Sequence, residues 1–272
     1  MLDGLLLMYS CRVKNPNQAI KSKLAGENIV DVREEDLLYF PNLTHLDVSD
    51  NQIALGQLLN LVSLQELDIQ YNNIDQLHLN LGSFPKMQTL ILSYNKVPTG
   101  QLAELGKLPA LTRLELASNE LSSLPANMSF FKTLQELNLS SNNFSSDSVL
   151  VDPNTLVGSL GTIPGLKKLN LSRNKFKKFH SDTLPQDNAT LPEQERAFSS
   201  LTELNLSFNA VDYEDDLTYP ATQIPTLAVL VVTGNPFSIT GQQENYDGLE
   251  QLLNKRGAIL VNETLNLSLI HI

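Results

Sequence analysis

The chain contains very little cysteine: Cys11 is the only one among 272 residues. A single thiol excludes an intrachain disulfide, and extracellular proteins commonly use such bonds to secure small folds. We therefore expect a reducing, cytoplasmic setting. A secretory leader is not expected either, because the apolar run in MLDGLLLMYS follows Asp3 instead of a basic residue. No stretch approaches the ~20 apolar residues of a membrane-spanning helix, so we expect no membrane partner.

Basic residues are outnumbered by acidic ones. The 19 Lys and Arg residues stand against 30 Asp and Glu, which gives a net charge of −11 and a pI of about 4.8. Nucleic-acid binding depends on basic surface that neutralises phosphates, so we expect no nucleic-acid partner. An acidic chain is better suited to meet a basic surface on another protein.

Residues that carry out catalysis are also sparse. The histidines lack the spacing of a metal site; they are His45, His78, His180 and His271. The segment from Gly100 to Lys107 departs from a phosphate-binding loop, because five residues separate its glycines and Leu108 replaces the hydroxyl that would hold magnesium. We expect a protein without catalytic residues, metal, cofactor or small-molecule substrate.

Leucine is abundant and follows a fixed pattern, L-x-x-L-x-L-x-x-N-x-L, with other apolar residues allowed at the leucine places. Eight copies occur, and their starts are 21 to 35 residues apart. The copies begin at Leu43, Leu64, Met87, Leu111, Leu134, Leu166, Leu201 and Leu227. This consensus and spacing are the signature of leucine-rich repeats.

Each copy predicts one strand of a solenoid. Its L-x-L core alternates with period two, as in a strand with one buried face. One repeat cannot bury these side chains alone, so stacked neighbours must share a continuous core. The expected fold is an α/β solenoid, a horseshoe with a concave parallel sheet, an irregular or short-helical convex side and a cap at each end.

Asparagine stands at the ninth place of all eight copies. These residues are Asn51, Asn72, Asn95, Asn119, Asn142, Asn174, Asn209 and Asn235. A buried amide offers two donors and an acceptor to the backbone groups where each coil leaves its strand. We therefore expect a structural ladder of asparagines, not a binding site.

One structural domain in three parts is expected: an N-terminal cap over residues 1–42, eight repeats over 43–237, and a C-terminal cap and tail over 238–272. In the first part, alternating Leu5 and Leu7 indicate a short strand. Its other expected features are a basic surface linker over Arg12–Lys23 and a helical turn over Arg33–Asp36.

Between and after the repeats, further elements are expected. A short convex helix is expected over 98–110 and a less regular one over 127–134; two long connections, 145–165 and 177–200, must leave the solenoid on the convex or rim side. In the last part, a helix over 246–255 should stop at Gly257 and precede a strand over 259–261.

Residues that flank the core leucines, and the residue before each Asn, are expected to face the hollow of the sheet. They are acidic with two neighbouring tyrosines in the first four repeats, and basic in the sixth. Tyrosine offers apolar area with a polar tip, which suits protein recognition; alternatively, these places are polar only because they face water. The candidate partner-binding residues are Asp47, Asp68, Tyr71, Tyr94, Glu115, Lys168, Arg173 and Phe208.

The N-terminal segment adds a resemblance beyond the generic repeats. LDGLLLMYSCRV at residues 2–13 and VREEDLLYFPNL at residues 32–43 resemble the start of the repeat domain of the X-ray radiation resistance-associated protein family, over about residues 2–60. The resemblance implies an intracellular, non-enzymatic protein with no catalytic residues to carry over. The repeats also look like leucine-rich-repeat subunits of motile-cilium complexes such as radial spokes.

Together these features predict a non-enzymatic protein-interaction scaffold. It would be a structural or assembly component of a large cytoplasmic complex such as a motile-cilium axoneme, with axonemal or cytoskeletal proteins as partners. The alternative is a regulatory or substrate-recognition subunit of a ubiquitin ligase or phosphatase. A cell-surface receptor domain is disfavoured by the missing cap cysteines.

Overall fold

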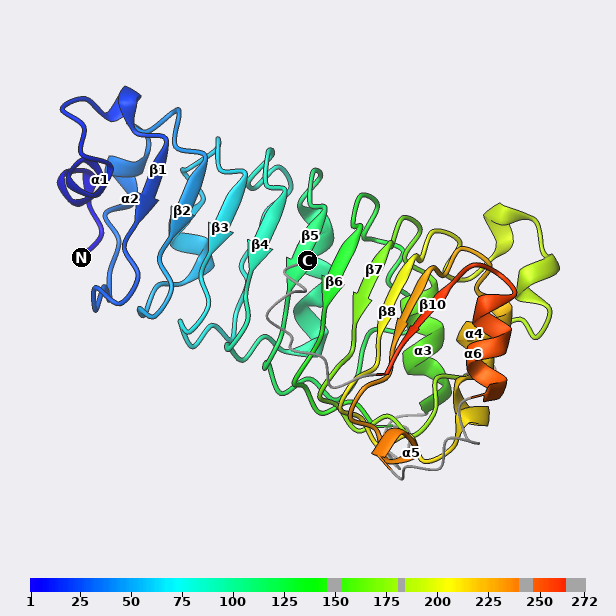
Figure 1. Cartoon of the computed structure of the whole chain (residues 1–272). Coiled ribbons are helices and arrows are strands. Elements are labelled where there is room, and N and C mark those ends of the chain that lie inside the picture. Colours follow the sequence, from blue (N-terminus) through cyan, green and yellow to red (C-terminus); the bar gives the residue numbers. More distant parts are fainter. Residues whose placement is uncertain (146–152, 181–183, 240–246, 263–272) are drawn as a thin grey trace. The chain divides into compact units, whose positions relative to one another are not determined.

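The structure is a computed structural model, and it describes residues 1–145, 153–180, 184–239 and 247–262. The chain divides into two compact units. The first unit comprises residues 1–121 and 128–138, and the second comprises residues 122–127 and 139–272. Each unit is built from coils that contribute one short strand apiece to a parallel sheet (Figure 1).

The first unit contains six strands of three residues each, paired in parallel in the order of the chain. They are β1 (Lys21–Lys23), β2 (His45–Asp47), β3 (Glu66–Asp68), β4 (Thr89–Ile91), β5 (Arg113–Glu115) and β6 (Glu136–Asn138). The register places Leu46 opposite Leu67 and Leu67 opposite Leu90. These central leucines are buried, which confirms the period-two pattern. The flanking residues lie on the other side, called here the open face of the sheet.

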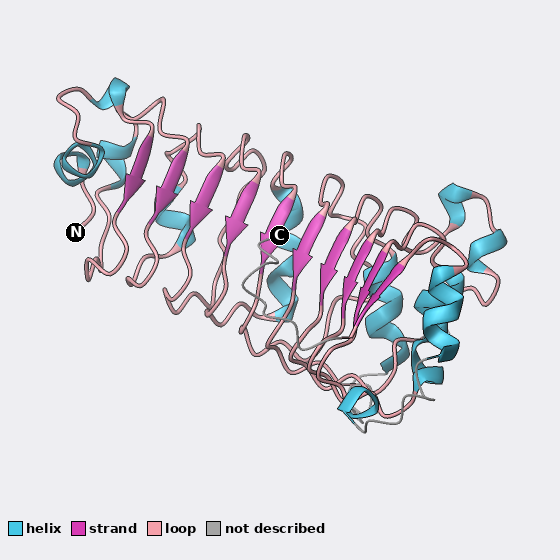
Figure 2. Ribbon diagram, viewed as in Figure 1, coloured by secondary structure: helices cyan, strands magenta, loops and turns pink. Residues whose placement is uncertain are grey.

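Short helices close the core on the side opposite the open face (Figure 2). They are α2 (Glu34–Leu37) and the 3-10 helices η2 (Leu55–Leu58) and η3 (Thr99–Lys107). Leu102 and Leu105 of η3 are buried, so the short helix predicted over 98–110 is confirmed. The helix predicted over 127–134 is wrong: only turns and bends occur there. Repeats of 21 to 24 residues leave few residues to return the chain to the next strand.

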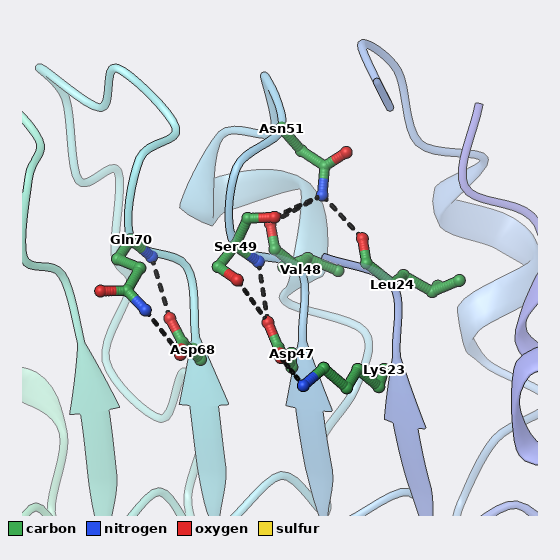
Figure 3. A network of polar contacts seen from close by, with 8 residues as sticks. All are labelled: Lys23, Leu24, Asp47, Val48, Ser49, Asn51, Asp68 and Gln70. Carbon is green, nitrogen blue, oxygen red and sulfur yellow. Dashed lines mark hydrogen bonds and ion pairs between the residues drawn. The ribbon is translucent and has the colours of Figure 1, made fainter. Parts of the chain in front are cut away.

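The asparagine ladder is confirmed, as Asn51 illustrates in Figure 3. Its Nδ2 donates to the carbonyls of Leu24 at 2.8 Å and Val48 at 3.0 Å. Its Oδ1 accepts the backbone N–H of Ile29 at 2.8 Å. One buried amide thus satisfies backbone groups of its own coil and of the preceding one, which joins successive coils through polar groups as well as leucines.

The N-terminal strand predicted from Leu5 and Leu7 is wrong. Both residues lie in α1 (Gly4–Cys11), where Leu7 is buried and Leu5 is exposed. Asp3 favours the helix because its Oδ1 accepts the N–H of Leu6 at 2.9 Å, which caps the first turn. The helix is followed by the 3-10 helix η1 (Pro16–Gln18).

Strand β1 lies inside the segment that was expected to be a surface linker. Ser22 occupies the central, buried place, and lysines occupy the flanks. The strand pairs with β2 in the same register as the later repeats. Because Ser22 replaces the leucine, the segment carries no apolar signal. The helical turn predicted over Arg33–Asp36 is confirmed by α2.

The described residues of the second unit include four strands, again parallel and in chain order. They are β7 (Lys168–Asn170), β8 (Glu203–Asn205), β9 (Val229–Val231) and β10 (Ile259–Val261). Its helices are α3 (Pro153–Gly161), η4 (Asn188–Thr190), η5 (Glu193–Glu195), η6 (Glu214–Leu217), α4 (Thr218–Gln223), α5 (Pro236–Ile239) and α6 (Asp247–Asn254).

The two long connections contain local structure where they are described. The first includes α3, whose Leu156, Val157 and Leu160 are buried. The second includes η4 and η5. The C-terminal elements are confirmed as α6 and β10, with Gly257 at a positive φ of 72° between them. The tail over 264–272 lies outside the described residues.

Candidate functional site

The predicted site residues fall into two groups. Asp47, Asp68, Tyr71, Tyr94 and Glu115 belong to the first unit, and Lys168, Arg173 and Phe208 to the second. The structure brings together three pairs. Asp47 and Asp68 are directly opposite each other on β2 and β3, the two tyrosines stack, and Arg173 lies over the Phe208 ring.

The residue before each ladder asparagine has a left-handed backbone. The φ values are 54° at Asp50, 54° at Tyr71, 57° at Tyr94, 54° at Ser118, 55° at Ser141, 55° at Arg173, 54° at Phe208 and 76° at Gly234. These residues are called here the rim positions. This backbone costs a non-glycine residue about 1–2 kcal/mol, and only the last rim position is glycine. The repeat therefore imposes a left-handed backbone at these places whichever residue occupies them.

Tyr71 and Tyr94 form a stacked pair on neighbouring coils. Their ring centroids are 4.2 Å apart and the planes differ by 9°. Each residue keeps about half of its surface exposed, 50% for Tyr71 and 46% for Tyr94. Backbone bonds hold both rim positions, since Tyr71 N donates to Ser93 O at 3.3 Å and Tyr94 N to Ala117 O at 2.8 Å. The pair is called here the tyrosine ridge.

A shallow depression of about 400 Å³ surrounds the ridge. Its lining residues are Asp50, Tyr71, Asn73, Tyr94, Asn95, Lys96, Ser118 and Glu120. Asn73, Lys96 and Glu120 were missed as site residues. Each stands two places after a rim position, and that spacing was the signal available in the sequence. Asn73 adds an amide, Lys96 a cation and Glu120 a carboxylate beside the two rings.

The acidic residues of the open face are engaged in local hydrogen bonds (Figure 3). Asp47 Oδ1 accepts the Ser49 N–H at 3.0 Å and the Ser49 hydroxyl at 2.7 Å, and its Oδ2 lies 3.8 Å from Lys23 Nζ. Asp68 accepts the backbone N–H and the side-chain amide of Gln70, each at 3.1 Å. These carboxylates therefore close the turn after the strand, in addition to any contact with a partner.

Glu115 lies in a network of its own on the open face. Its Oε1 accepts from Arg113 Nε at 2.9 Å, and its Oε2 accepts from Asn138 Nδ2 at 2.6 Å. The Glu115 side chain is largely covered as a result. Its charge is compensated locally, so it is a weaker candidate for partner contact than the tyrosines.

Burial raises the pKa of Asp68 above its ordinary value of 3.8. The N–H of Gln70 opposes this shift, because it stabilises the carboxylate, while the nearby charges of Asp47 and Glu66 raise the pKa further. A carboxyl whose pKa is higher in the folded than in the unfolded chain lowers the free energy of unfolding at a pH above that raised pKa. It has no such effect once the pH is well below 3.8, where both states are protonated.

Asp68→Asn is therefore expected to raise the melting temperature at neutral pH, with a gain that disappears as the pH falls toward 3. Asparagine preserves the turn, because Asn205 Oδ1 accepts the Ser207 N–H at 2.9 Å at the equivalent place of β8. Thermal unfolding followed by circular dichroism across pH tests this, with the exposed Asp75→Asn as the matched control. A gain that is independent of pH would contradict the electrostatic explanation.

In the second unit, the Arg173 guanidinium lies 4.6 Å from the centroid of the Phe208 ring, on the next coil. Phe208 is 37% exposed. Lys168 lies on β7, in register with Glu203 of β8. The structure therefore places Lys168 beside a carboxylate and Arg173 beside an aromatic ring.

Among the described residues, no group of three or more His, Cys, Asp or Glu could hold a metal ion. No helix in the described ranges is both long and apolar enough to span a membrane. The Cys11 thiol donates to the Lys21 carbonyl at 3.2 Å, and burial raises the pKa of this thiol. A raised pKa favours the protonated, less nucleophilic thiol.

Comparison with known proteins agrees with the repeat pattern. A family model described as Leucine Rich repeat matches residues 41–54, 60–76, 132–150 and 199–215. The chain is 27% identical over 194 residues to X-ray radiation resistance-associated protein 1 of Mus musculus, an alignment that covers 65% of this chain and 24% of that protein. It is 33% identical over 141 residues to the probable serine/threonine-protein kinase pats1 of Dictyostelium discoideum, covering 48% of this chain and 4% of the kinase.

Solved structures share the fold at low sequence identity. An internalin of Listeria monocytogenes matches with a TM-score of 0.59 and 17% identity, covering 95% of this chain and 74% of the internalin. The curated relatives are much longer, since the alignment spans about a quarter of the mouse protein (24%). Motif, strand register and shared fold agree: the chain contains leucine-rich repeats, folded as coils that each add a parallel strand.

Proposed function

We propose that this chain is a non-enzymatic scaffold whose first unit binds a partner protein around Tyr71 and Tyr94. Leucine-rich-repeat folds generally serve protein–protein interaction, which supports the broad assignment. The observation that carries the specific site is the stacked, half-exposed tyrosine pair at left-handed positions.

The ridge has the physical properties of a binding hot spot. Two stacked rings offer apolar area and lose little side-chain entropy on binding, since each is already ordered by the other. Asp50, Lys96 and Glu120 surround the rings and supply hydrogen-bonding groups around this apolar centre. An aromatic centre with a polar periphery is the usual anatomy of a protein interface.

The setting we propose is a large cytoplasmic assembly, such as a motile-cilium axoneme. The single cysteine supports a reducing compartment. Proximity labelling with a tagged copy in ciliated cells, together with its localisation, tests the setting and identifies partners for binding measurements.

Replacing both tyrosines, Tyr71→Asn with Tyr94→Asn, is expected to weaken partner binding by about 30-fold or more, the effect of losing a hot spot of ~2 kcal/mol. Asparagine tolerates the left-handed backbone, as Asn73 shows at φ 56°. The fold should therefore remain as stable as before. Affinity is measured by calorimetry with the purified partner, and stability by thermal unfolding.

The matched control replaces two exposed tyrosines elsewhere in the first unit, Tyr9→Asn with Tyr39→Asn. It should leave the affinity unchanged. If both double variants bind like the original chain, the proposed site is wrong. If the main co-purifying partner is a catalytic subunit of a ubiquitin ligase or phosphatase, the regulatory-subunit alternative is favoured instead.

A further inference from the structure

The basic residues of this acidic chain are concentrated in one coil of the second unit. Six of the 19 Lys and Arg residues lie between positions 167 and 178, and no Asp or Glu lies among them. They are Lys167, Lys168, Arg173, Lys175, Lys177 and Lys178. This segment therefore carries a dense positive charge, whereas the chain as a whole has a net charge of −11.

These six residues differ in whether a carboxylate lies near them. Lys168 is in register with Glu203 on the adjacent strand. Burial raises the pKa of Asp216, and the positive charge of Lys178 opposes this shift, so both lysines have a carboxylate nearby. Arg173 and Lys175 are exposed, beyond the carboxyl end of β7. Lys167 and Lys177 are exposed as well, and Arg173 and Lys175 are singled out because Phe208 lies against Arg173.

The residues beside Arg173 and Lys175 on the neighbouring coils carry no negative charge. At the equivalent places, the preceding coil has Ser141 and Asn143, and the following coil has Phe208 and Ala210. Lys175 Nζ donates to Asn143 Oδ1 at 3.3 Å, which is a neutral partner.

Phe208 holds Arg173 in place. The guanidinium lies 4.6 Å from the ring centroid, within the range of a cation–π contact. Gly234 lies on the coil that follows Phe208, and it makes room for the ring because a Cβ at position 234 would overlap Phe208. The ring is thereby positioned by two coils. A guanidinium stacked in this way is preorganised to donate two parallel N–H groups to a carboxylate.

We propose that the second unit binds an acidic segment of a partner protein on a surface formed by Arg173, Lys175 and Phe208, called here the basic rim. Carboxylates of the segment pair with Arg173 and Lys175. Phe208, which is 37% exposed, contacts the aliphatic part of a glutamate or an apolar residue between the acids. The site lies in the second unit, and it does not depend on the tyrosine ridge.

Fluorescence anisotropy with a labelled peptide of alternating glutamate and glycine tests the proposal. We expect saturable binding that weakens as salt is added. Arg173→Gln with Lys175→Gln should weaken it at least about tenfold, the effect of losing a charge-assisted hydrogen bond. The control Arg33→Gln with Lys132→Gln removes two exposed basic residues from the first unit, changes the net charge equally and should leave the affinity unchanged.

A third variant, Phe208→Asn, tests the aromatic support while all charges remain. It should weaken peptide binding about two- to fivefold, as expected for loss of an exposed cation–π contact. The proposal is overturned if the glutamate peptide does not bind, or if the control variant loses as much affinity as the rim variant. It is also overturned if duplex DNA or phosphatidylserine vesicles bind the rim more tightly than the peptide does.

Discussion

Asn95→Ala is expected to lower the free energy of unfolding by about 3–5 kcal/mol, because it leaves two buried backbone N–H groups without their acceptor, at a cost of about 1–3 kcal/mol each, and removes one donor from each of three carbonyls. Asn95 is 4% exposed. Its amide nitrogen donates to the carbonyls of Ile69 (3.0 Å), Leu92 (3.0 Å) and Ser93 (3.3 Å), and its oxygen accepts the N–H groups of Asn72 (3.0 Å) and Ile74 (2.9 Å). Urea unfolding followed by tyrosine fluorescence and circular dichroism measures the change.

Asn80→Ala is the matched control, since Asn80 is an exposed amide in the preceding repeat. It should change the free energy of unfolding by less than about 0.5 kcal/mol. Asn95→Asp keeps the acceptor but loses the donor at neutral pH, so it should be as harmful as alanine and recover partly when acid protonates the carboxyl. Equal stability of the Asn95 and Asn80 alanine variants would mean that water replaces the amide.

The ladder and the strands could be predicted because their signals are repeated. Leu46, Leu67 and Leu90 recur at one place of the motif, and eight copies make the register unambiguous. Strand β1 could not be found this way, because Ser22 takes the buried place and lysines flank it. Its strand conformation comes from pairing with β2, a tertiary effect that outweighs local propensity.

The candidate site was predictable in position but not in geometry. The motif places Tyr71 and Tyr94 at equivalent rim positions of adjacent coils, so their proximity follows from the repeat. Their stacking depends on side-chain rotation, and the contact between Arg173 and Phe208 joins residues 35 positions apart through an irregular connection. Neither is contained in a one-dimensional pattern.

The long connection over 177–200 shows the same limit. The repeat spacing reveals that extra residues are present, but not what holds them. In the structure, the Tyr219 hydroxyl donates to the Pro185 carbonyl at 3.4 Å, and burial raises the pKa of Tyr219 to about 12. The central support is Asn188, which is 0% exposed and whose importance no motif indicates.

Asn188→Ala is expected to release residues 184–200 from the second unit and to lower the stability of that unit by about 2–4 kcal/mol. The substitution leaves three backbone groups without a hydrogen-bond partner, at a cost of about 1–3 kcal/mol each. Asn188 Nδ2 donates to the carbonyls of Ala197 at 3.0 Å and Gln223 at 2.8 Å. Its Oδ1 accepts the Ala197 N–H at 2.8 Å. The amide thus joins two parts of the connection, at Asn188 and Ala197, and binds them to Gln223 at the end of α4.

Limited proteolysis and hydrogen exchange measure this release, because cleavage and exchange within 184–200 report local opening. Gln194→Ala removes an exposed amide from the same connection and should leave both rates unchanged. Tyrosine-ridge binding in the first unit should be unaffected by Asn188→Ala if this amide acts only on the second unit. Unchanged proteolysis of the Asn188 variant would show that the buried contacts of Leu184 and Phe198 hold the connection without the amide.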